Sequence, residues 1–481
     1  MGNLANLKPA GVFKHFEEIC AIPHGSGNLT AISDYCVQFA QKHGLHWYRD
    51  ETNNVIIYKD ASPGYEGAEP LILQGHLDMV CEKDDGIDFD FQQNGVIPLT
   101  DGKTVWAQGT TLGGDDGIAV AIMLTLLEEN DLRHPPLEIL LTADEETSMA
   151  GAFQLDCGML HGHRMINLDS EDEGILTCSC AGGVDALTAM SVRRDPMTGT
   201  LTTVEISGLT GGHSGADIHK GNANANVLMA RLLDDLGDKC AFHIAAFDGG
   251  TRPNVIPTAA KAVIVLTPEN QKEAECQLLK FWDTLKNEYS ATDAEMNISV
   301  SSTPSSSSAL SDVDTKRVID LLLALPDGVQ TMSPDMEGLV QTSTNLAVVR
   351  LEGERLEILS SIRSSVESQK NMLLRKIFAV AALAGARTER QGDYPGWRYN
   401  PSSALRDVVK AAYQKVSGKP AVIEAIHAGL ECGLFADRID HLDCVSIGPN
   451  MKNVHTPSEY LDVASCERFY ELLKEVLAMC G

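Results

Sequence analysis

The sequence feature that most constrains the fold is a set of short apolar runs that each lead into a histidine or into carboxylates. The runs at residues 71–73, 137–141 and 165–168 precede His76, the pair Glu145-Glu146 and Asp169. Runs of this length are typical of buried strands, and helical patterns such as residues 118–129 lie between them. Buried strands that alternate with helices predict a mainly parallel sheet with helices on its faces. Because ligands bind at the carboxyl ends of such strands, these side chains are expected at one edge of one sheet.

The length of 481 residues exceeds what one hydrophobic core usually supports, so two domains are expected. The α/β pattern stops near residue 186 and returns near residue 397, after a segment rich in Gly, Pro and aromatic residues. Between these points two rounds of strands and helices follow each other, and the serine run at 305–308 is expected to be a loop. The predicted fold is therefore α/β. A discontinuous first domain, residues 1–186 and 397–481, has a mainly parallel mixed sheet flanked by helices, and an inserted α+β domain, residues 187–396, has two similar lobes.

Composition argues against several classes of partner and location. The formal net charge of −29 argues against nucleic acid and against an anionic membrane surface, because both attract clustered Lys and Arg. No apolar run reaches the roughly 18 to 20 residues of a membrane span, and no secretory signal is visible. The 12 cysteines lack C-x-x-C spacing, which is typical of reduced thiols in the cytosol. Cys178 and Cys180 are expected to pack in the core rather than to bind metal.

For two of the motifs, a purely structural role is an alternative to metal binding. His76 and Asp78 can act as a metal ligand and the residue that orients it, or they can form a polar pair in a turn. Asp115-Asp116 lies between glycines and ahead of an apolar helix. A carboxylate there can approach an ion closely or cap the helix, and the residues alone do not decide between the two.

The adjacent glutamates Glu145 and Glu146 are more informative, because two half-buried like charges require a cation or a proton to compensate them. One can ligate a metal while its neighbour acts as a base, although a solvated turn is the alternative. Asp169 begins an acidic stretch, for which a solvated loop is the more common interpretation. His455, expected from the first domain's own sheet after the insert, is uninformative alone. The joint occurrence of the five motifs in this order favours a dinuclear metal site, and hence a metallohydrolase.

Five strings of the chain are specific in combination: Gln74-Gly75-His76-Leu77-Asp78-Met79-Val80, Gly109-Thr110-Thr111-Leu112-Gly113-Gly114-Asp115, Thr142-Ala143-Asp144-Glu145-Glu146-Thr147, Gly211-Gly212-His213-Ser214-Gly215 and His427-Ala428-Gly429-Leu430-Glu431-Cys432-Gly433. Together they resemble the M20 family of zinc peptidases, and within it the aminoacyl-histidine dipeptidases. The likeness covers essentially the whole chain. It implies a catalytic domain with an inserted lid, so the first domain would be catalytic and the insert would be the lid.

The resemblance also implies roles for the motif residues. Four residues would be terminal ligands of two zinc ions, for which manganese or cobalt can substitute: His76, Glu146, Asp169 and His455. Asp115 would bridge the two ions, Asp78 would support His76, and Glu145 would be the general base on a water that bridges the metals. The peptide bond between Asp115 and Asp116 is often cis in relatives, which commonly have Ala where this chain has Gly114.

The lid would supply substrate-binding residues. His213 resembles the lid histidine that stabilises the developing oxyanion, although a histidine that caps its own loop is the alternative. Asn254 and Arg363 resemble polar residues that bind substrate, and the planar fork of Arg363 suits a terminal carboxylate. Gly429, expected in the first domain, resembles a substrate-contact position. Closure of the lid around a small substrate would favour dipeptides over long chains.

These observations predict a cytosolic zinc dipeptidase that hydrolyses unblocked dipeptides, among them Xaa-His substrates such as β-alanyl-histidine (carnosine). An N-acyl amino acid deacylase of the same architecture is the second hypothesis, because the metal chemistry would be the same. A non-catalytic metal-binding protein is the third, and the presence of Glu145 argues against it. A homodimer formed through the lid is favoured slightly over a monomer.

Overall fold

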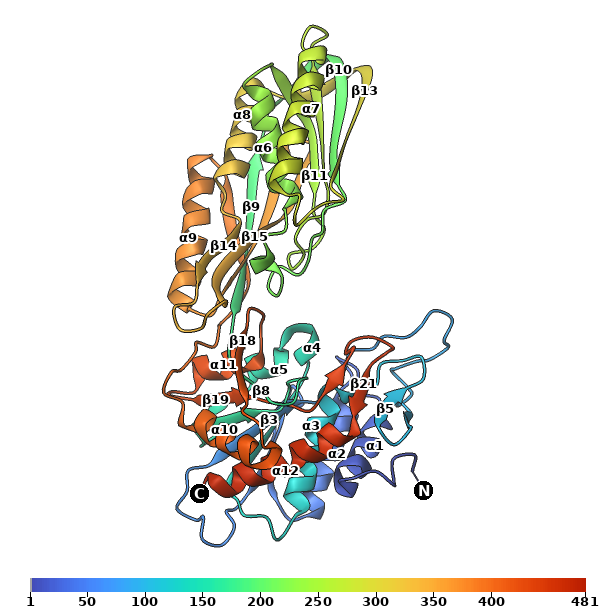
Figure 1. Ribbon diagram of the computed structural model, residues 1–481, viewed down its shortest axis with the longest axis vertical. Coiled ribbons are helices and arrows are strands. Elements are labelled where there is room, and N and C mark those ends of the chain that lie inside the picture. The colour runs from blue at the N-terminus through green and yellow to red at the C-terminus, as the bar shows by residue number, and fades with distance from the viewer. Residues whose placement is uncertain (1) are drawn as a thin grey trace. The chain divides into compact units, whose positions relative to one another are not determined.

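The structure is a computed structural model that describes residues 2–481, without the side chains of Ser305 and Ser306, and it divides into two compact units (Figure 1). Unit 1 comprises three stretches, Met1–Ser179, Tyr399–Ala425 and Leu430–Gly481. Unit 2 comprises Cys180–Arg398 and the short stretch Ile426–Gly429. Each unit has its own hydrophobic core, so unit 1 is assembled from parts that lie far apart in the sequence.

The main sheet of unit 1 has eight strands in the order β1-β2-β6-β3-β7-β19-β8-β18. Their bounds are β1 His46–Arg49, β2 Val55–Lys59, β3 Leu71–His76, β6 Leu137–Thr142, β7 Arg164–Asn167, β8 Ile175–Cys180, β18 Val422–Ile426 and β19 Asp443–Ser446. The central strands β6, β3, β7 and β19 run parallel, while β1, β2 and β8 join through antiparallel pairs. Strands β3 and β6 are buried along their whole length, as parallel strands covered on both faces are. The predicted mixed α/β fold is confirmed.

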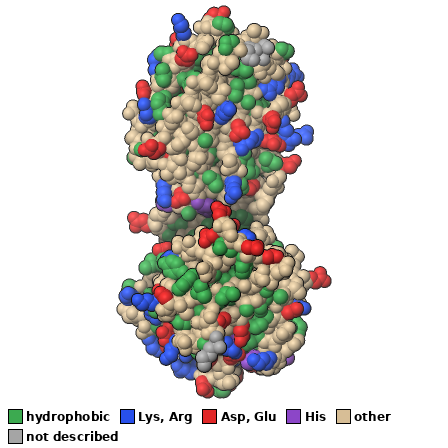
Figure 2. Space-filling model, turned by 90° about the vertical axis from the view of Figure 1, so that its right-hand side faces the viewer, with side chains coloured by type: hydrophobic (Ala, Val, Ile, Leu, Met, Phe, Trp, Pro, Cys, Tyr) green, Lys and Arg blue, Asp and Glu red, His purple; other side chains and the backbone are tan. Residues whose placement is uncertain are grey.

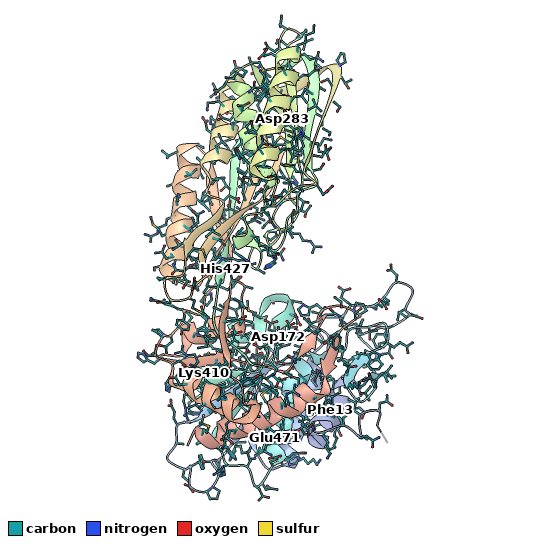
Figure 3. The ribbon with its side chains drawn as sticks, viewed as in Figure 1. Phe13, Asp172, Asp283, Lys410, His427 and Glu471 are labelled. Carbon is teal, nitrogen blue, oxygen red and sulfur yellow. The ribbon has the colours of Figure 1, made fainter. Side chains whose placement is uncertain are left out.

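Helices cover this sheet and close the core of unit 1. They are α1 Ala10–Cys20, α2 Thr30–Lys42, α3 Gly114–Glu128, α4 Glu145–Ser148, α5 Ala150–Gln154, α10 Ala404–Ser417, α11 Glu431–Arg438 and α12 Val463–Met479. Helix α3 is buried on all sides up to Leu127 because almost every residue after its first turn is apolar, and it packs on α1 and β3. Phe13 of α1, labelled in Figure 3, is fully buried in this core. The first turn of α3 is thereby held rigidly beside the end of β3.

A second, four-stranded sheet of unit 1 carries His455. Its strands, in the order β20-β21-β5-β4, are β20 Met451–Lys452, β21 Tyr460–Asp462, β5 Thr104–Ala107 and β4 Pro98–Thr100. His455 lies in the loop between β20 and β21, so the expectation that it comes from the main sheet is wrong. Strands of two to four residues are too short to leave a periodic apolar signal in the sequence.

Unit 2 is built on one nine-stranded sheet in the order β13-β10-β12-β11-β15-β16-β9-β17, with β14 paired to β15. The strands are β9 Gly182–Ser191, β10 Arg194–Ser207, β11 Phe242–Gly249, β12 Ala260–Leu266, β13 Asn297–Leu310, β14 Gly328–Met332, β15 Val340–Glu352, β16 Arg355–Ser364 and β17 Arg387–Tyr394. Helices α6 Ala225–Gly237, α7 Gln271–Glu288, α8 Asp312–Ala324 and α9 Glu367–Leu383 cover one face of it (Figure 1). The two successive sets of strands and helices expected from the sequence lie side by side in this one sheet. They join where β11 pairs with β15, and they share one hydrophobic core.

Three details differ from the sequence expectations. The serine run at 305–308 is part of strand β13, paired in register with β10, and not a loop. The boundaries between the units lie a few residues from those expected, because Cys180 and Trp397 exchange backbone hydrogen bonds of 3.0 Å inside unit 2. The expectation that Gly429 lies in the first domain is wrong, since Gly429 belongs to unit 2, where the neighbouring Ala428 carbonyl accepts the Ala181 N–H.

The surface carries both signs of charge. On the face shown in Figure 2, Lys and Arg side chains lie among Asp and Glu side chains over both units. In the part of the chain that the structure describes, no helix combines the length and the apolar character that a membrane crossing requires.

Candidate metal centre

The carboxyl ends of β3, β6 and β7 bring the predicted metal-site residues of the first half of the chain to one place in unit 1. His76 is the last residue of β3, Glu145 begins the short helix α4 after β6, and Asp169 follows β7. Asp115 lies in the first turn of α3, and the peptide bond that follows it is cis, as the family resemblance implied. His455 reaches the same cluster from the β20–β21 loop with a left-handed backbone, φ 62°.

The two carboxylate oxygens of Asp115 face two different histidines. Oδ1 of Asp115 lies 3.0 Å from Nε2 of His76, and Oδ2 lies 3.2 Å from Nε2 of His455. On the first side, Oδ1 of Asp169 is 3.6 Å from the same His76 nitrogen. On the second side, Oε1 of Glu146 is 2.9 Å from the His455 nitrogen. The five predicted ligands therefore form two sets, each with one histidine and one terminal carboxylate, that share Asp115.

Asp78 contacts more residues of the candidate metal centre than the sequence predicted. Nδ1 of His76 lies 3.0 Å from the backbone oxygen of Asp78 and 3.5 Å from its Oδ1. The Asp78 carboxylate also accepts the backbone N–H groups of Glu145, at 2.9 Å, and Glu146, at 3.2 Å, together with the Ser26 hydroxyl at 2.7 Å. One buried carboxylate thus orients the His76 ring and fixes the glutamate pair.

Burial acts strongly on the ionisable groups of this cluster. It raises the pKa of Asp169 to about 7, with the charge of Asp115 adding to the effect. Burial also raises the pKa of Glu145 to about 8, against an opposing histidine charge. Hydrogen bonds to Asp115 and Glu146 raise the pKa of His455 to about 11. Among the residues that the structure describes, histidines balance these gathered carboxylates, and such a donor set suits a divalent cation.

The four predicted substrate-binding residues lie together in unit 2: His213, Asn254, Arg363 and Gly429. Nδ1 of His213 accepts the backbone N–H groups of Gly215, at 3.2 Å, and Ala216, at 3.0 Å. In the neutral ring this pattern places the proton on Nε2, which is left to donate a hydrogen bond. The Ser214 N–H donates to the Asn254 carbonyl at 2.9 Å, so the two predicted residues sit on paired segments.

Arg363 of β16 lies in a cluster of ring side chains. Its Nη1 donates to the hydroxyl of Tyr394 at 3.2 Å, and a Cβ at Gly429 would lie 3.0 Å from the Tyr394 ring, so only glycine leaves that ring its full space. Nε2 of His427, labelled in Figure 3, is 2.7 Å from the hydroxyl of Ser343. Burial, followed by the charge of Arg363, lowers the pKa of His427 to about 3, so this ring is neutral at physiological pH.

Comparison with known families decides the class of the protein. Residues 72–479 match the model of peptidase family M20/M25/M40, which is most of the chain. The chain belongs to peptidase family M20. Over 479 residues, which are 99% of each chain, this M20 peptidase is 37% identical to the cytosol non-specific dipeptidase of Escherichia coli (strain K12). The expected enzyme class, a dipeptidase that hydrolyses peptide bonds, is confirmed by these relatives.

Solved structures agree with this assignment. The aminoacylhistidine dipeptidase of Vibrio alginolyticus is 37% identical, with a TM-score of 0.95 over 99% of this M20 peptidase and 98% of that chain. The aminopeptidase PepT of Bacillus cereus, 14% identical with a TM-score of 0.57 over 98% and 99% of the two chains, shares the fold. The whole two-unit architecture, and not one domain alone, is therefore common to the M20 peptidase and these structures.

Sequence reasoning missed several residues that support the centre. The Glu431 carboxylate accepts hydrogen bonds from Nε2 of Gln74 at 2.6 Å and from the Thr142 hydroxyl at 2.7 Å, beneath the ends of β3 and β6. Oδ2 of Asp116 accepts the backbone N–H of His76 at 3.2 Å. Glu431 lies in a string that carried the family resemblance, and Asp116 adjoins a predicted ligand. Neither had a signal of its own, because the partners are far away in the sequence.

Proposed function

We propose that this M20 peptidase is a dipeptidase that depends on two divalent cations and hydrolyses unblocked dipeptides, including those with a C-terminal histidine. The observation that carries the proposal is the placement of Asp115 between His76 and His455, with Glu145 next to the ligand Glu146. A carboxylate that presents one oxygen to each of two ligand sets suits a pair of cations. The dipeptidase names of two full-length relatives support the type of substrate.

The donor atoms fit two divalent cations. His76, Asp169 and Asp115 would hold one, while His455, Glu146 and Asp115 would hold the other. Imidazole nitrogens combined with carboxylate oxygens favour zinc, with manganese or cobalt as alternatives. When bound, the two cations would acidify a water molecule and polarise the carbonyl of the scissile bond.

The protein's own residues then act around that bond. Glu145, fixed through its backbone by Asp78, takes a proton from the attacking water onto its carboxylate and returns it to the leaving amine. Two cations beside Glu145 would keep it ionised at neutral pH, against the effect of burial. In this proposal Nε2–H of His213 would donate to the developing oxyanion, since Nδ1 of that ring already accepts two N–H groups.

Unit 2 would supply the recognition of the substrate. Arg363 presents a planar fork of donors that suits the terminal carboxylate of a dipeptide. Asn254 offers a polar group on the segment paired with that of His213, and Gly429 leaves space beside Tyr394. The two relatives bear different substrate names, one non-specific and one aminoacyl-histidine, and we propose a range that includes β-alanyl-histidine.

We also propose a cytosolic location, in line with the name of the Escherichia coli relative, and a homodimer formed through unit 2. The exposed apolar side chains Val313, Met372 and Leu383, on or beside the helical layer, would be partly covered in such a dimer, and Leu383 is 90% exposed. Sedimentation velocity of the full chain decides the oligomeric state. A single monomeric species at all concentrations would contradict the dimer.

A panel of substrates tests the proposed activity. The purified chain is assayed on unblocked dipeptides, including β-alanyl-histidine and alanyl-histidine, and on N-acetylated amino acids. Each assay is repeated after chelation and after return of zinc, manganese or cobalt. We expect hydrolysis of dipeptides that chelation abolishes and metal restores. Hydrolysis of the acylated amino acids alone would instead identify an N-acyl amino acid deacylase.

A further inference from the structure

The carboxylate of Glu459 accepts hydrogen bonds from four consecutive backbone N–H groups. Oε2 of Glu459 lies 2.7 Å from the nitrogen of Leu112 and 3.2 Å from that of Gly113. Oε1 lies 2.8 Å from the nitrogen of Gly114 and 3.3 Å from that of Asp115. Glu459 is only 3% exposed, so water cannot take the place of these donors. Successive N–H groups that converge in this way form an anion-binding nest.

The nest is the segment that carries Asp115 into the metal centre. Gly113 adopts a left-handed conformation, φ 72°, which turns the N–H groups on both sides toward one point. The assigned helix α3 begins at Gly114, but Asp115 and Asp116 depart from helical backbone angles, so these four N–H groups lie ahead of the regular part of the helix. The Glu459 carboxylate satisfies them. The backbone of Asp115 is therefore fixed by Glu459.

Glu459 itself belongs to the loop that carries His455, so it connects that loop with the segment of Asp115. Glu459 ends this loop just before β21, and the loop is closed by short hydrogen bonds of its own. The Thr456 hydroxyl donates to the Asn453 carbonyl at 2.7 Å, and the Glu459 N–H donates to the Thr456 carbonyl at 3.1 Å. These two hydrogen bonds close the loop on itself between Asn453 and Glu459. The position of His455 is consequently tied to the position of Glu459, four residues later.

We propose that Glu459 is a positioning residue that sets the spacing between Asp115 and His455, and so the affinity of the centre for the cation between them. Glu459 fastens the two segments from which the facing atoms come, Oδ2 of Asp115 and Nε2 of His455, 3.2 Å apart. Both of its carboxylate oxygens already accept backbone N–H groups, so we do not propose it as a metal ligand. This inference rests on the proposed two-cation function and adds a residue that was not among the predicted ligands.

Glu138 provides a matched control in the same unit. It is also 3% exposed, and its carboxylate accepts the backbone N–H groups of His161 and Gly162 at 3.0 and 3.1 Å and lies 2.8 Å from Nδ1 of the His161 ring. None of its partners carries a predicted metal ligand. The substitution Glu138→Gln therefore removes the same charge from another buried carboxylate that accepts backbone N–H groups, and it reports the structural effect of doing so.

The test compares the full-length wild type, Glu459→Gln and Glu138→Gln after removal of metal. In Glu459→Gln the amide NH₂ would face two of the backbone N–H groups, so the nest must open. Binding of cobalt is followed by titration calorimetry and by its visible spectrum, and unfolding of the metal-free form is followed by circular dichroism. We expect Glu459→Gln to weaken one of the two cobalt sites by about 10- to 100-fold and to change the spectrum. Glu138→Gln should keep both sites while lowering the unfolding temperature to a similar extent.

The outcomes separate this inference from the proposed function. A wild type that binds no metal overturns the proposed function, and the inference with it. A wild type that binds two cobalt ions, with Glu459→Gln binding them equally well, overturns the inference alone. If Glu459→Gln does not fold, Glu459→Asp, which keeps the charge on a shorter side chain, replaces it. That variant should show a smaller loss at one site, and wild-type affinity at both sites would refute the role.

Discussion

His455 and Asp115 are 340 positions apart in the chain, yet Nε2 of the first lies 3.2 Å from Oδ2 of the second. The other oxygen of Asp115 faces His76, which comes from the main sheet. Asp115, in the first turn of α3, therefore lies next to one histidine from the main sheet and one from the hairpin formed by β20 and β21. The proposed metal centre requires the main sheet, helix α3 and this hairpin all to be in place.

Substitution of the shared residue should differ from substitution of a terminal ligand. Asp115→Ala is expected to lose both cations, because each ligand set loses a donor. His455→Ala should lose one and keep the set around His76 and Asp169. Elemental analysis after desalting gives the metal content per chain. Equal metal content in the two variants would contradict a bridging position for Asp115.

Glu145→Gln should separate metal binding from turnover. The amide keeps the shape of the side chain but cannot take a proton, so we expect unchanged metal content and a kcat reduced by about 10²- to 10⁴-fold. Steady-state kinetics on a dipeptide, together with elemental analysis, checks both parts. Glu138→Gln, which removes a buried carboxylate away from the centre, is the control and should retain most of the turnover. Wild-type kcat in Glu145→Gln would remove the residue from its role as base.

Arg363→Lys keeps a positive charge but loses the planar fork. If Arg363 binds the terminal carboxylate with two hydrogen bonds, KM should rise by about 10-fold or more while kcat changes less. Tyr394→Phe removes only the hydroxyl that accepts from Arg363, and it should raise KM by a smaller factor. A dipeptide amide, which lacks the carboxylate, provides the comparison. An equal loss of kcat/KM on the dipeptide and on its amide would show that Arg363 does not bind the terminal carboxylate.

The stability of unit 2 should depend on pH through Asp327. Burial raises the pKa of its carboxyl from 3.8 to about 6, although the Leu346 N–H and Asn224 donate hydrogen bonds to it. The folded state thus holds more protons than the unfolded state between pH 4 and pH 6, so stability falls as pH rises through this window. Asp327→Asn should remove this slope and be more stable than the wild type at pH 7, by up to about 3 kcal/mol. Denaturant unfolding at pH 4 and pH 7 measures the difference, and parallel curves for the two proteins would refute it.

The strands that end at the metal centre could be predicted because they are buried on both faces. Residues 71–73 and 137–141 are unbroken apolar runs, and such runs indicate parallel strands with a site at their carboxyl ends. The structure places His76 and Glu145 at or just after those ends. The positions of His76 and Glu145 just after two buried strands were therefore enough to predict that they lie close together.

Other parts left no local signal. The four-stranded sheet that carries His455 consists of strands of two to four residues, whose pairing depends on contacts far along the chain. Strand β13 includes a serine run that resembles a loop, yet its backbone pairs along its whole length with β10, so tertiary context outweighs propensity. Glu459 is one acidic residue in a polar segment, and nothing in the sequence points to the N–H groups of Leu112 to Asp115.

The discontinuity of unit 1 has a consequence for the newly made chain. Synthesis proceeds at about 5 to 20 residues per second, so the roughly 290 residues between Asp169 and His455 take about 15 to 60 s to appear. During that interval the strands that bear His76 and Asp169 exist without the hairpin that bears His455. A nascent chain at this stage lacks one histidine of the proposed metal centre. The proposed centre is therefore completed only after the stretch that bears His455 has left the ribosome.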